Sequence, residues 1–279
     1  MGDQAGIGPE VVDAALASGQ LPDGFDFRVI GRRVDVVPGE PTVESARAAL
    51  EALEESVRLM KSGQIDAVVT APVGKEGLHQ AGFAFPGQTE FFAARLACDN
   101  YAMCLTGKNL TVALVTIHVA LAEVPGLLSE EEIIRVGDLL GRFCIQRGIR
   151  EPRVAVCGLN PHAGENGAFG REDVEIVAPA VAKLRANDNG VVFSGPHPAD
   201  TIFRPAAEGE YDAVLCMYHD QGLIPLKLLD FDTGVNVTLG LPVPRTSPDH
   251  GTAYGIAGKG VASPSSMIQA IRLACEMKS

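Results

Sequence analysis

The sequence contains no run that is rich in lysine and arginine. Its 23 basic residues stand against 35 acidic ones, which gives the 279-residue chain a formal net charge of −12. Nucleic-acid-binding proteins need a basic patch or stripe, because binding neutralises phosphate charges. We therefore expect no nucleic-acid partner, and any anionic ligand must be held by a few local basic residues.

Long apolar runs are also missing. No run approaches the roughly 20 residues that span a bilayer, and the N-terminus has no charged region followed by an apolar one. The six cysteines are scattered and form no Cys-x-x-Cys pair, which is typical of reduced, buried thiols in a cytosolic protein. These absences predict a cytoplasmic protein that does not bind membranes.

Two common nucleotide-binding patterns are absent. No Gly-x-Gly-x-x-Gly follows a strand-like run, and Gly260 stands where a P-loop requires Ser or Thr. The segment DHGTAYGIAGKG places Asp249 and His250 before a possible helix start at Gly251. A helix start among small residues can bring backbone N–H groups to a dinucleotide, although one such segment does not identify a cofactor.

The sequence does contain an alternation of strand-like and helix-like segments. The apolar runs are mostly continuous, which is typical of strands covered on both faces, and the helical spacing lies between them. Ser129 followed by Glu132 indicates a helix start of the capping-box type. The alternation predicts an α/β fold with a mostly parallel sheet. The expected strands are 27–30, 65–72, 101–105, 110–118, 153–162, 211–219 and 234–241, and the expected helices are 42–62, 88–97, 129–147, 171–186 and 264–277.

The opening MGDQAGIGPE reads as a glycine-rich turn followed by a helix start. A strand normally leads into such a turn, so we expect a strand ahead of it that the given sequence does not contain. The stretch 31–41 is expected to have little regular structure.

Three apolar runs end in histidine: VALVTIH at His118, VAVCGLNPH at His162 and AVLCMYH at His219. Ligands of open parallel sheets bind at the carboxyl ends of strands, so these imidazoles could converge. Three histidines with an open position describe a catalytic divalent-metal site. A single histidine in such a place is more often a satisfied polar residue, and three at equivalent places favour the metal site.

Polar residues near these runs suggest further chemistry. Asp200 and Asp220 could orient an imidazole or accept a proton. Lys227, Asn236 and Arg245 interrupt a strongly apolar stretch, and burying them is costly without a partner. A phosphate would be a suitable partner for a lysine and an arginine, and surface exposure is the alternative.

Eight segments in order along nearly the whole chain resemble one family. They are GDQAGIGPE, TAPVGKEGLHQAG, GQTEFF, GLNPHAGENGAFG, GPHPADTIF, YHDQGLIPLK, GVNVTLGLPVPRTSPDHGTA and IAGKGVA. Together they are similar to the 4-hydroxythreonine-4-phosphate dehydrogenases of vitamin B6 biosynthesis. The HGTAYGIAGKG segment is similar to the cofactor loop of isocitrate and isopropylmalate dehydrogenases, whose fold that family shares.

The resemblance implies a two-lobed α/β/α fold with the active site in the cleft between the lobes. The first lobe would comprise residues 1–107 and 240–279 and include the cofactor loop. The second, residues 108–239, would carry the metal ligands and the interface of a homodimer whose subunits share the active site. The resemblance also implies NAD or NADP, bound by Asp249, His250, Gly251, Thr252 and Ala253.

The implied reaction oxidises the C3 hydroxyl of 4-phosphooxy-L-threonine, and the β-keto acid then loses carbon dioxide to give 3-amino-2-oxopropyl phosphate. His118, His162 and His219 would bind the metal. Three imidazoles suit zinc first, with cobalt or nickel as alternatives, and nearby carboxylates would admit magnesium or manganese. Asp200 and Asp220 are the expected catalytic residues. The residues expected to bind substrate are Gln88, Thr89, Lys227, Asn236 and Arg245.

Gln88 departs from the family, which usually has histidine there. A glutamine amide can donate a hydrogen bond but cannot be cationic, so related substrates stay open, namely D-threonate 4-phosphate or an aromatic cis-dihydrodiol carboxylate. Two other classes also remain. One is a metal-dependent lyase or aldolase without nicotinamide, and the other is a catalytically silent metabolite-binding protein.

Overall fold

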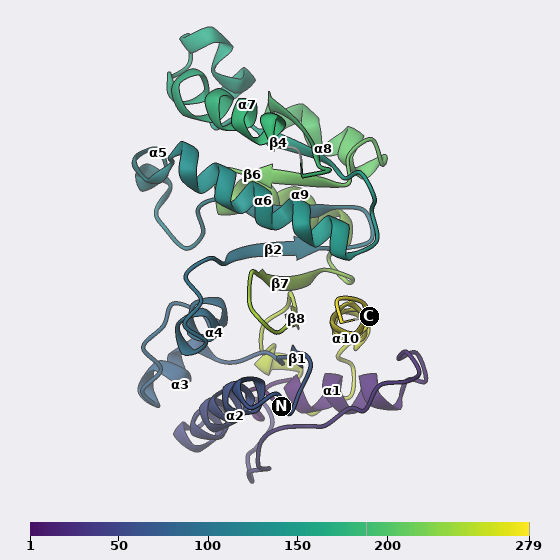
Figure 1. Cartoon of the computed structure of the whole chain (residues 1–279). Coiled ribbons are helices and arrows are strands. Elements are labelled where there is room, and N and C mark those ends of the chain that lie inside the picture. The colour runs from purple at the N-terminus through teal and green to yellow at the C-terminus, as the bar shows by residue number, and fades with distance from the viewer. Residues whose placement is uncertain (188, 279) are drawn as a thin grey trace. The chain divides into compact units, whose positions relative to one another are not determined.

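The computed structural model describes residues 1–187 and 189–278 (Figure 1). The chain divides into two compact units. The first unit comprises Met1–Asp99 and the chain from Asp232 onward, and the second comprises Asn100–Phe231. Both boundaries lie eight residues earlier along the chain than the lobe boundaries expected from the sequence, at 107/108 and 239/240.

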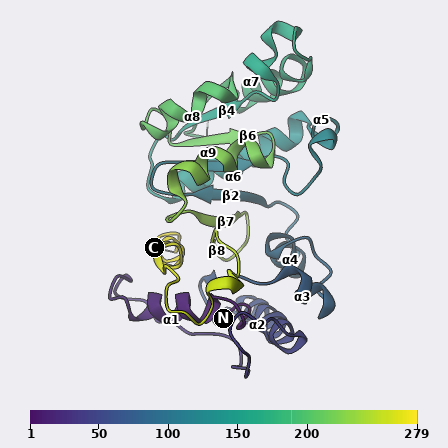
Figure 2. The same cartoon turned by 180° about the vertical axis from the view of Figure 1, so that it is seen from behind.

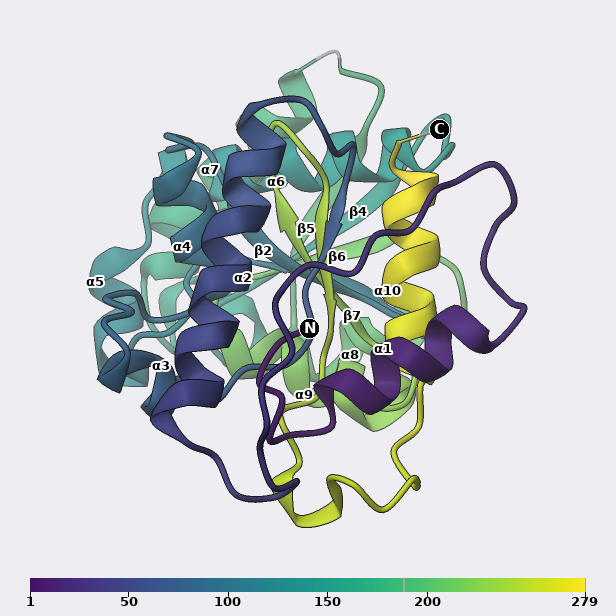
Figure 3. The same cartoon turned by 90° about the horizontal axis from the view of Figure 1, so that it is seen from below.

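The first unit contains a sheet in the order β1-β8-β7. β1 (Val68–Val69) pairs in parallel with β8 (Arg245–Pro248), which pairs antiparallel with β7 (Val235–Leu239). Val68 packs with one cluster of helices and Val69 with another, as expected for strand neighbours that face opposite sides. Figure 3 shows α2 and α10 on either side of the strands. The helices are α1 (Gly8–Ala17) and α10 (Ser265–Glu276) on one face, and α2 (Val43–Lys61), α3 (Lys75–Gln80) and α4 (Gln88–Arg95) on the other.

The second unit contains a sheet in the order β2-β3-β6-β4-β5. β2 and β3 are antiparallel, and the remaining neighbours are parallel. α6 covers one face (Figure 1), and α8 and α9 cover the other (Figure 2). The strands are β2 (Ala102–Thr106), β3 (Thr111–Leu114), β4 (Arg153–Cys157), β5 (Val192–His197) and β6 (Ala213–Cys216), and the helices are α5 (Val124–Leu127), α6 (Glu130–Gln146), α7 (Ala178–Ala186), α8 (Ala199–Ala207) and α9 (His219–Asp230), with a 3-10 turn at Leu121–Glu123.

Burial explains why the strand runs are continuous in the sequence. Every residue of β2, β3 and β6 is buried, so apolar side chains are needed on both faces. Helix α6 begins as expected, because the Ser129 hydroxyl accepts a hydrogen bond from the Glu132 N–H at 3.2 Å. The expected α/β class with a mostly parallel sheet is confirmed.

Several expected boundaries were wrong. Residues 27–30 form no strand, because they have no ladder partner. The runs expected at 153–162 and 211–219 end as strands at Cys157 and Cys216, and helix α7 is preceded by a π-helical turn at Asp173–Val177. Strands β5 and β8 were not predicted, because their sequences, VFSGPH and RTSP, are too polar to resemble core strands.

Within the described residues, no helix is both long enough and apolar enough to traverse a bilayer. All six cysteines are free thiols; five are buried and Cys98 is partly exposed.

The carboxylate of Asp230 organises the turn between β2 and β3. Asp230 ends α9 and is only 3% exposed. It accepts hydrogen bonds from the backbone N–H groups of Lys108, Asn109 and Leu110 at 2.9–3.1 Å. A Cβ at Gly107 would lie 2.4 Å from the Asp230 side chain, so the turn fits closely around the carboxylate.

We predict that Asp230→Asn lowers the free energy of unfolding by about 2–3 kcal/mol, because an amide nitrogen would replace an acceptor among clustered N–H donors. Urea unfolding followed by circular dichroism measures the change. Asp232→Asn, at an exposed position two residues on, is the matched control and should change stability little. Equal stability of the two variants would contradict the role assigned to Asp230.

Candidate active site

His162 lies on an unusual turn that follows β4. Five successive residues, His162–Asn166, have left-handed φ angles between 41° and 79° within the segment Pro161–Gly167. Non-glycine residues in this region each carry a strain of about 1–2 kcal/mol. The turn is held by the buried carboxylate of Asp173, which accepts the N–H groups of Leu159 at 2.6 Å and Asn160 at 2.9 Å.

His118 and His219 lie close together in the second unit. Their ring centroids are 5.8 Å apart, with 44° between the ring planes. His118 follows β3, and His219 is the first residue of α9, directly after β6. Nδ1 of His219 is 2.7 Å from a carboxylate oxygen of Asp220, an arrangement that orients an imidazole.

The structure brings together two of the three expected metal ligands. The ring of His162 packs instead against Phe169, with centroids 6.0 Å apart. Among residues 1–187 and 189–278, no group of three or more His, Cys, Asp or Glu side chains is placed to hold a metal ion. Neighbouring imidazoles with an orienting carboxylate fit a borderline cation such as zinc, which binds histidine nitrogen at about 2.0–2.1 Å.

Three other expected substrate-binding residues, Gln88, Thr89 and Asn236, lie around the Arg245 guanidinium in the first unit. Its Nη1 donates to Asn236 Oδ1 at 3.4 Å and to Thr238 Oγ1 at 3.3 Å. Its Nη2 donates to Thr70 Oγ1 at 2.7 Å and to Gln88 Oε1 at 3.2 Å. The Thr89 hydroxyl completes the group, 3.3 Å from that of Thr238.

Arg245 is charged but almost fully buried. It is 3% exposed, and its Nε atom has no hydrogen-bond partner among the described residues. Burial lowers the pKa of Arg245 to about 10, while the charge of Glu90 acts in the opposite direction, so the guanidinium remains cationic at neutral pH. Its hydrogen-bonded partners are neutral, which leaves a site suited to a phosphate or carboxylate.

The other expected residues occupy separate places. Lys227 is a half-buried residue of α9 in the second unit. Asp200 is exposed in the first turn of α8, and Asp220 is exposed beside His219. Thr70 and Thr238 were not predicted from the sequence as partners of Arg245. A buried arginine needs polar neighbours, and the hydroxyl of a residue near the end of a strand is a candidate for such a neighbour.

The segment expected to bind the cofactor follows β8. The helix expected at Gly251 is a single 3-10 turn, Tyr254–Ile256, preceded by Ala253 in the left-handed region. The backbone carbonyl of Thr252 accepts a hydrogen bond from the Ile7 N–H at 2.9 Å, and a Cβ at Gly6 would approach the same carbonyl to 2.7 Å. The segment therefore packs tightly on the opening turn of the chain.

Two polar side chains of this segment, those of His250 and Tyr254, are relevant to cofactor binding. Nε2 of His250 is buried and has no hydrogen-bond partner among the described residues. This is a property expected of an atom that binds a ligand. Tyr254 donates its hydroxyl to Asp3 Oδ2 at 2.6 Å. Burial, followed by this hydrogen bond, raises the pKa of Tyr254 to about 12.

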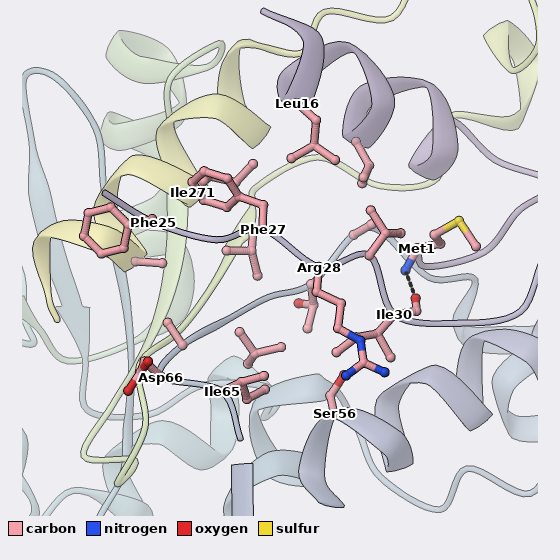
Figure 4. Close-up of a pocket in the computed structure, with 18 of the residues that line it drawn as sticks. Met1, Leu16, Phe25, Phe27, Arg28, Ile30, Ser56, Ile65, Asp66 and Ile271 are labelled. Atoms are coloured by element: carbon pink, nitrogen blue, oxygen red, sulfur yellow. Dashed lines mark hydrogen bonds between the residues drawn. The ribbon is translucent and has the colours of Figure 1, made fainter. Parts of the chain in front are cut away.

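A cavity of about 600 Å³ lies elsewhere in the first unit (Figure 4). It is lined mainly by apolar side chains of residues 24–30, of β1 and its flanks, and of helices α1, α2 and α10. The Met1 amino group donates to the Ile30 carbonyl at 3.0 Å along one wall. None of the expected site residues lines this cavity, although Thr70, which accepts a hydrogen bond from Arg245, is one of its lining residues.

Comparison with known proteins identifies the family. The model of the pyridoxal phosphate biosynthetic protein PdxA matches residues 12–274. The chain belongs to the PdxA family. A 4-hydroxythreonine-4-phosphate dehydrogenase of Erythrobacter litoralis is 52% identical over 246 residues, which cover 86% of this chain and 72% of that protein.

Solved structures agree with this PdxA assignment. The structure of a putative 4-hydroxythreonine-4-phosphate dehydrogenase from Salmonella typhimurium is 38% identical, has a TM-score of 0.83 and covers 99% of this chain and 97% of its own. An isocitrate dehydrogenase from Methylococcus capsulatus covers 99% of this chain and 82% of its own, with a TM-score of 0.55 at 16% identity. The expected family, and its fold shared with isocitrate dehydrogenases, are confirmed.

We predict that Glu165→Gly stabilises this PdxA-family chain by about 1 kcal/mol, because glycine adopts the φ of 41° at this exposed position without strain. Thermal and urea unfolding measure the effect. Glu151→Gly is the matched control, since Glu151 is also exposed and in the same unit but has no positive φ. A loss of stability in both variants would show that the turn is not strained at Glu165.

Proposed function

We propose that this PdxA-family chain is a 4-hydroxythreonine-4-phosphate dehydrogenase of pyridoxal phosphate biosynthesis. It oxidises the C3 hydroxyl of 4-phosphooxy-L-threonine with NAD or NADP, and the product decarboxylates to 3-amino-2-oxopropyl phosphate. The observation that carries the proposal is the buried Arg245 guanidinium with its unpaired Nε, a binding site for an anion. Curated relatives that bear the name of this activity support it.

The substrate is held by the group around Arg245. The guanidinium binds an acidic group of the substrate, and Thr89 and Asn236 supply neutral hydrogen bonds to it. Gln88 both limits the movement of Arg245 and offers an amide to the substrate. Lys227 adds a second positive charge, which suits a substrate with both a phosphate and a carboxylate.

His118, His162 and His219 hold a divalent cation, zinc in the first instance with magnesium, cobalt or manganese as alternatives. When bound, such a cation stabilises negative charge on the C3 oxygen during oxidation and decarboxylation. Asp220 keeps the His219 ring oriented through its Nδ1. Asp200 or Asp220 accepts the proton of the hydroxyl group that is oxidised.

The nicotinamide cofactor is bound by Asp249, His250, Gly251, Thr252 and Ala253. The unpaired Nε2 of His250 supports this assignment, because a buried polar atom needs a partner. We further propose that the protein works in the cytoplasm as a homodimer whose subunits share each active site, which can supply ligands that one chain does not bring together.

A related substrate is the second candidate. A terephthalate 1,2-cis-dihydrodiol dehydrogenase from Burkholderia xenovorans is 29% identical, has a TM-score of 0.69 and covers 98% of this chain and 95% of its own. The neutral Gln88 beside Arg245 is compatible with a carboxylate of such a diol, which carries no phosphate. D-Threonate 4-phosphate would retain the phosphate and lack the amino group.

Turnover of the three substrates, each with NAD and with NADP, tests the proposal. Absorbance of the reduced nicotinamide is followed with and without a chelator, and with metal added back. We expect the highest kcat/KM with 4-phosphooxy-L-threonine, loss of activity with the chelator and recovery with a divalent cation. Preference for the diol would overturn the substrate, conversion without nicotinamide would indicate a lyase, and binding without turnover would indicate a silent protein.

We predict that Arg245→Lys lowers kcat/KM by about 10- to 100-fold, because lysine replaces a planar group of donors by a single ammonium and loses a charged hydrogen bond of about 1.5–3 kcal/mol. Steady-state kinetics measures the loss. Arg272→Lys, on the exposed face of α10, is the control and should leave kcat/KM unchanged. Equal kinetics for the two variants would remove Arg245 from substrate binding.

A further inference from the structure

The three histidine-bearing segments follow strands that are neighbours in the order β3-β6-β4. Between β3 and β6 the hydrogen bonds continue past the strand ends. The Val115 N–H donates to the Cys216 carbonyl at 2.9 Å. Thr116 donates to the Met217 carbonyl through both its N–H, at 3.1 Å, and its hydroxyl, at 2.8 Å. The segment leading to His118 is thereby fixed to the segment leading to His219.

Between β6 and β4 the connection is made by the side chain of Gln221. Gln221 lies in the first turn of α9 and is only 7% exposed. Its Oε1 accepts the Met217 N–H at 2.7 Å, and its Nε2 donates to the Gly158 carbonyl at 2.8 Å. One primary amide therefore joins the ends of two strands, and both of its polar atoms are used.

The Gly158 carbonyl is at the base of the left-handed turn that carries His162. A Cβ at Gly158 would lie 2.8 Å from Ala163 and 2.8 Å from Asp173, so the peptide has little freedom to move. Asp173 then holds the next two N–H groups, those of Leu159 and Asn160. A change at the Gly158 carbonyl would thus be transmitted to His162.

We infer that Gln221 is a positioning residue for the metal-binding histidines, an inference that rests on the proposed function. Gln221 is not itself a ligand, because its oxygen and nitrogen are both bonded to backbone groups. It fixes the start of α9, and so His219, relative to the turn that carries His162. Through Met217 it also acts on the segment that carries His118.

The experiment compares metal binding by wild type and Gln221→Met, which keeps the length of the side chain and removes its amide. Metal-free protein is titrated with Zn²⁺ by calorimetry and with Co²⁺ by visible absorption, which reports coordination geometry. We expect Gln221→Met to bind both ions about 10- to 100-fold more weakly, the range typical for partners that orient metal ligands. Its Co²⁺ spectrum should also differ from that of wild type.

A kinetic comparison separates positioning from a general loss of structure. The metal concentration for half-maximal activity should rise in Gln221→Met by the same factor, while kcat at saturating metal stays within about threefold of wild type. Thr111→Val is the control, since it removes a buried hydroxyl bond to Thr106 at the opposite end of β3. It should lower stability without changing metal affinity.

Metal affinity of Gln221→Met within threefold of wild type would overturn the inference and leave the proposed function intact. Failure of wild type to bind any divalent cation would overturn both. If Gln221→Met does not fold, Gln221→Glu carries the same test, because it retains the acceptor for Met217 and loses the donor to Gly158. Failure of both variants to fold would make Gln221 a structural residue and overturn the inference.

Discussion

The continuous burial of the strands determines where polar and charged side chains can lie in this protein. A sheet covered on both faces has no room for an unpaired polar group, so polar side chains gather where strands begin and end. His118, His162 and His219 all follow buried strands, and Arg245 is the first residue of one. The same rule governs Asp230 and Asp173, which satisfy the N–H groups of tight turns beside the sheet of the second unit.

The two groups of candidate functional residues are built in different ways. Around Arg245 a single buried charge is surrounded by hydroxyl and amide groups, and under the proposed function a substrate would replace one or more of these partners. Around the histidines, buried backbone and amide hydrogen bonds fix the segments that carry the side chains, of which those of His118 and His162 are exposed and that of His219 is half-buried. The proposed anion site is compatible with a strongly acidic chain, because it depends on one desolvated cation and not on net charge.

The sequence was sufficient for the fold class and for most of the buried elements, because continuous apolar runs and helical spacing reflect local burial. It was insufficient where an element depends on its neighbours. Phe27–Ile30 has the composition of a strand but no partner, whereas RTSP at β8 is polar yet lies between two strands. The histidines were predicted as metal ligands because each ends an apolar run, and that role stays a prediction. The contacts of Thr70, Thr238 and Gln221 could not be predicted, because they join distant segments of the chain and no local pattern records them.

The burial of the thiols has a practical consequence. Burial raises the pKa of Cys104, Cys144 and Cys216 far above neutrality, so these sulfurs stay protonated and are poor nucleophiles. Cys98, half-buried and with its Sγ 3.3 Å from the Gly240 carbonyl, is the one cysteine of the six that solvent reaches appreciably. An alkylating dye would therefore label the native protein at a single position, which provides a fluorescent reporter in the unit that holds Arg245 without removing any other cysteine.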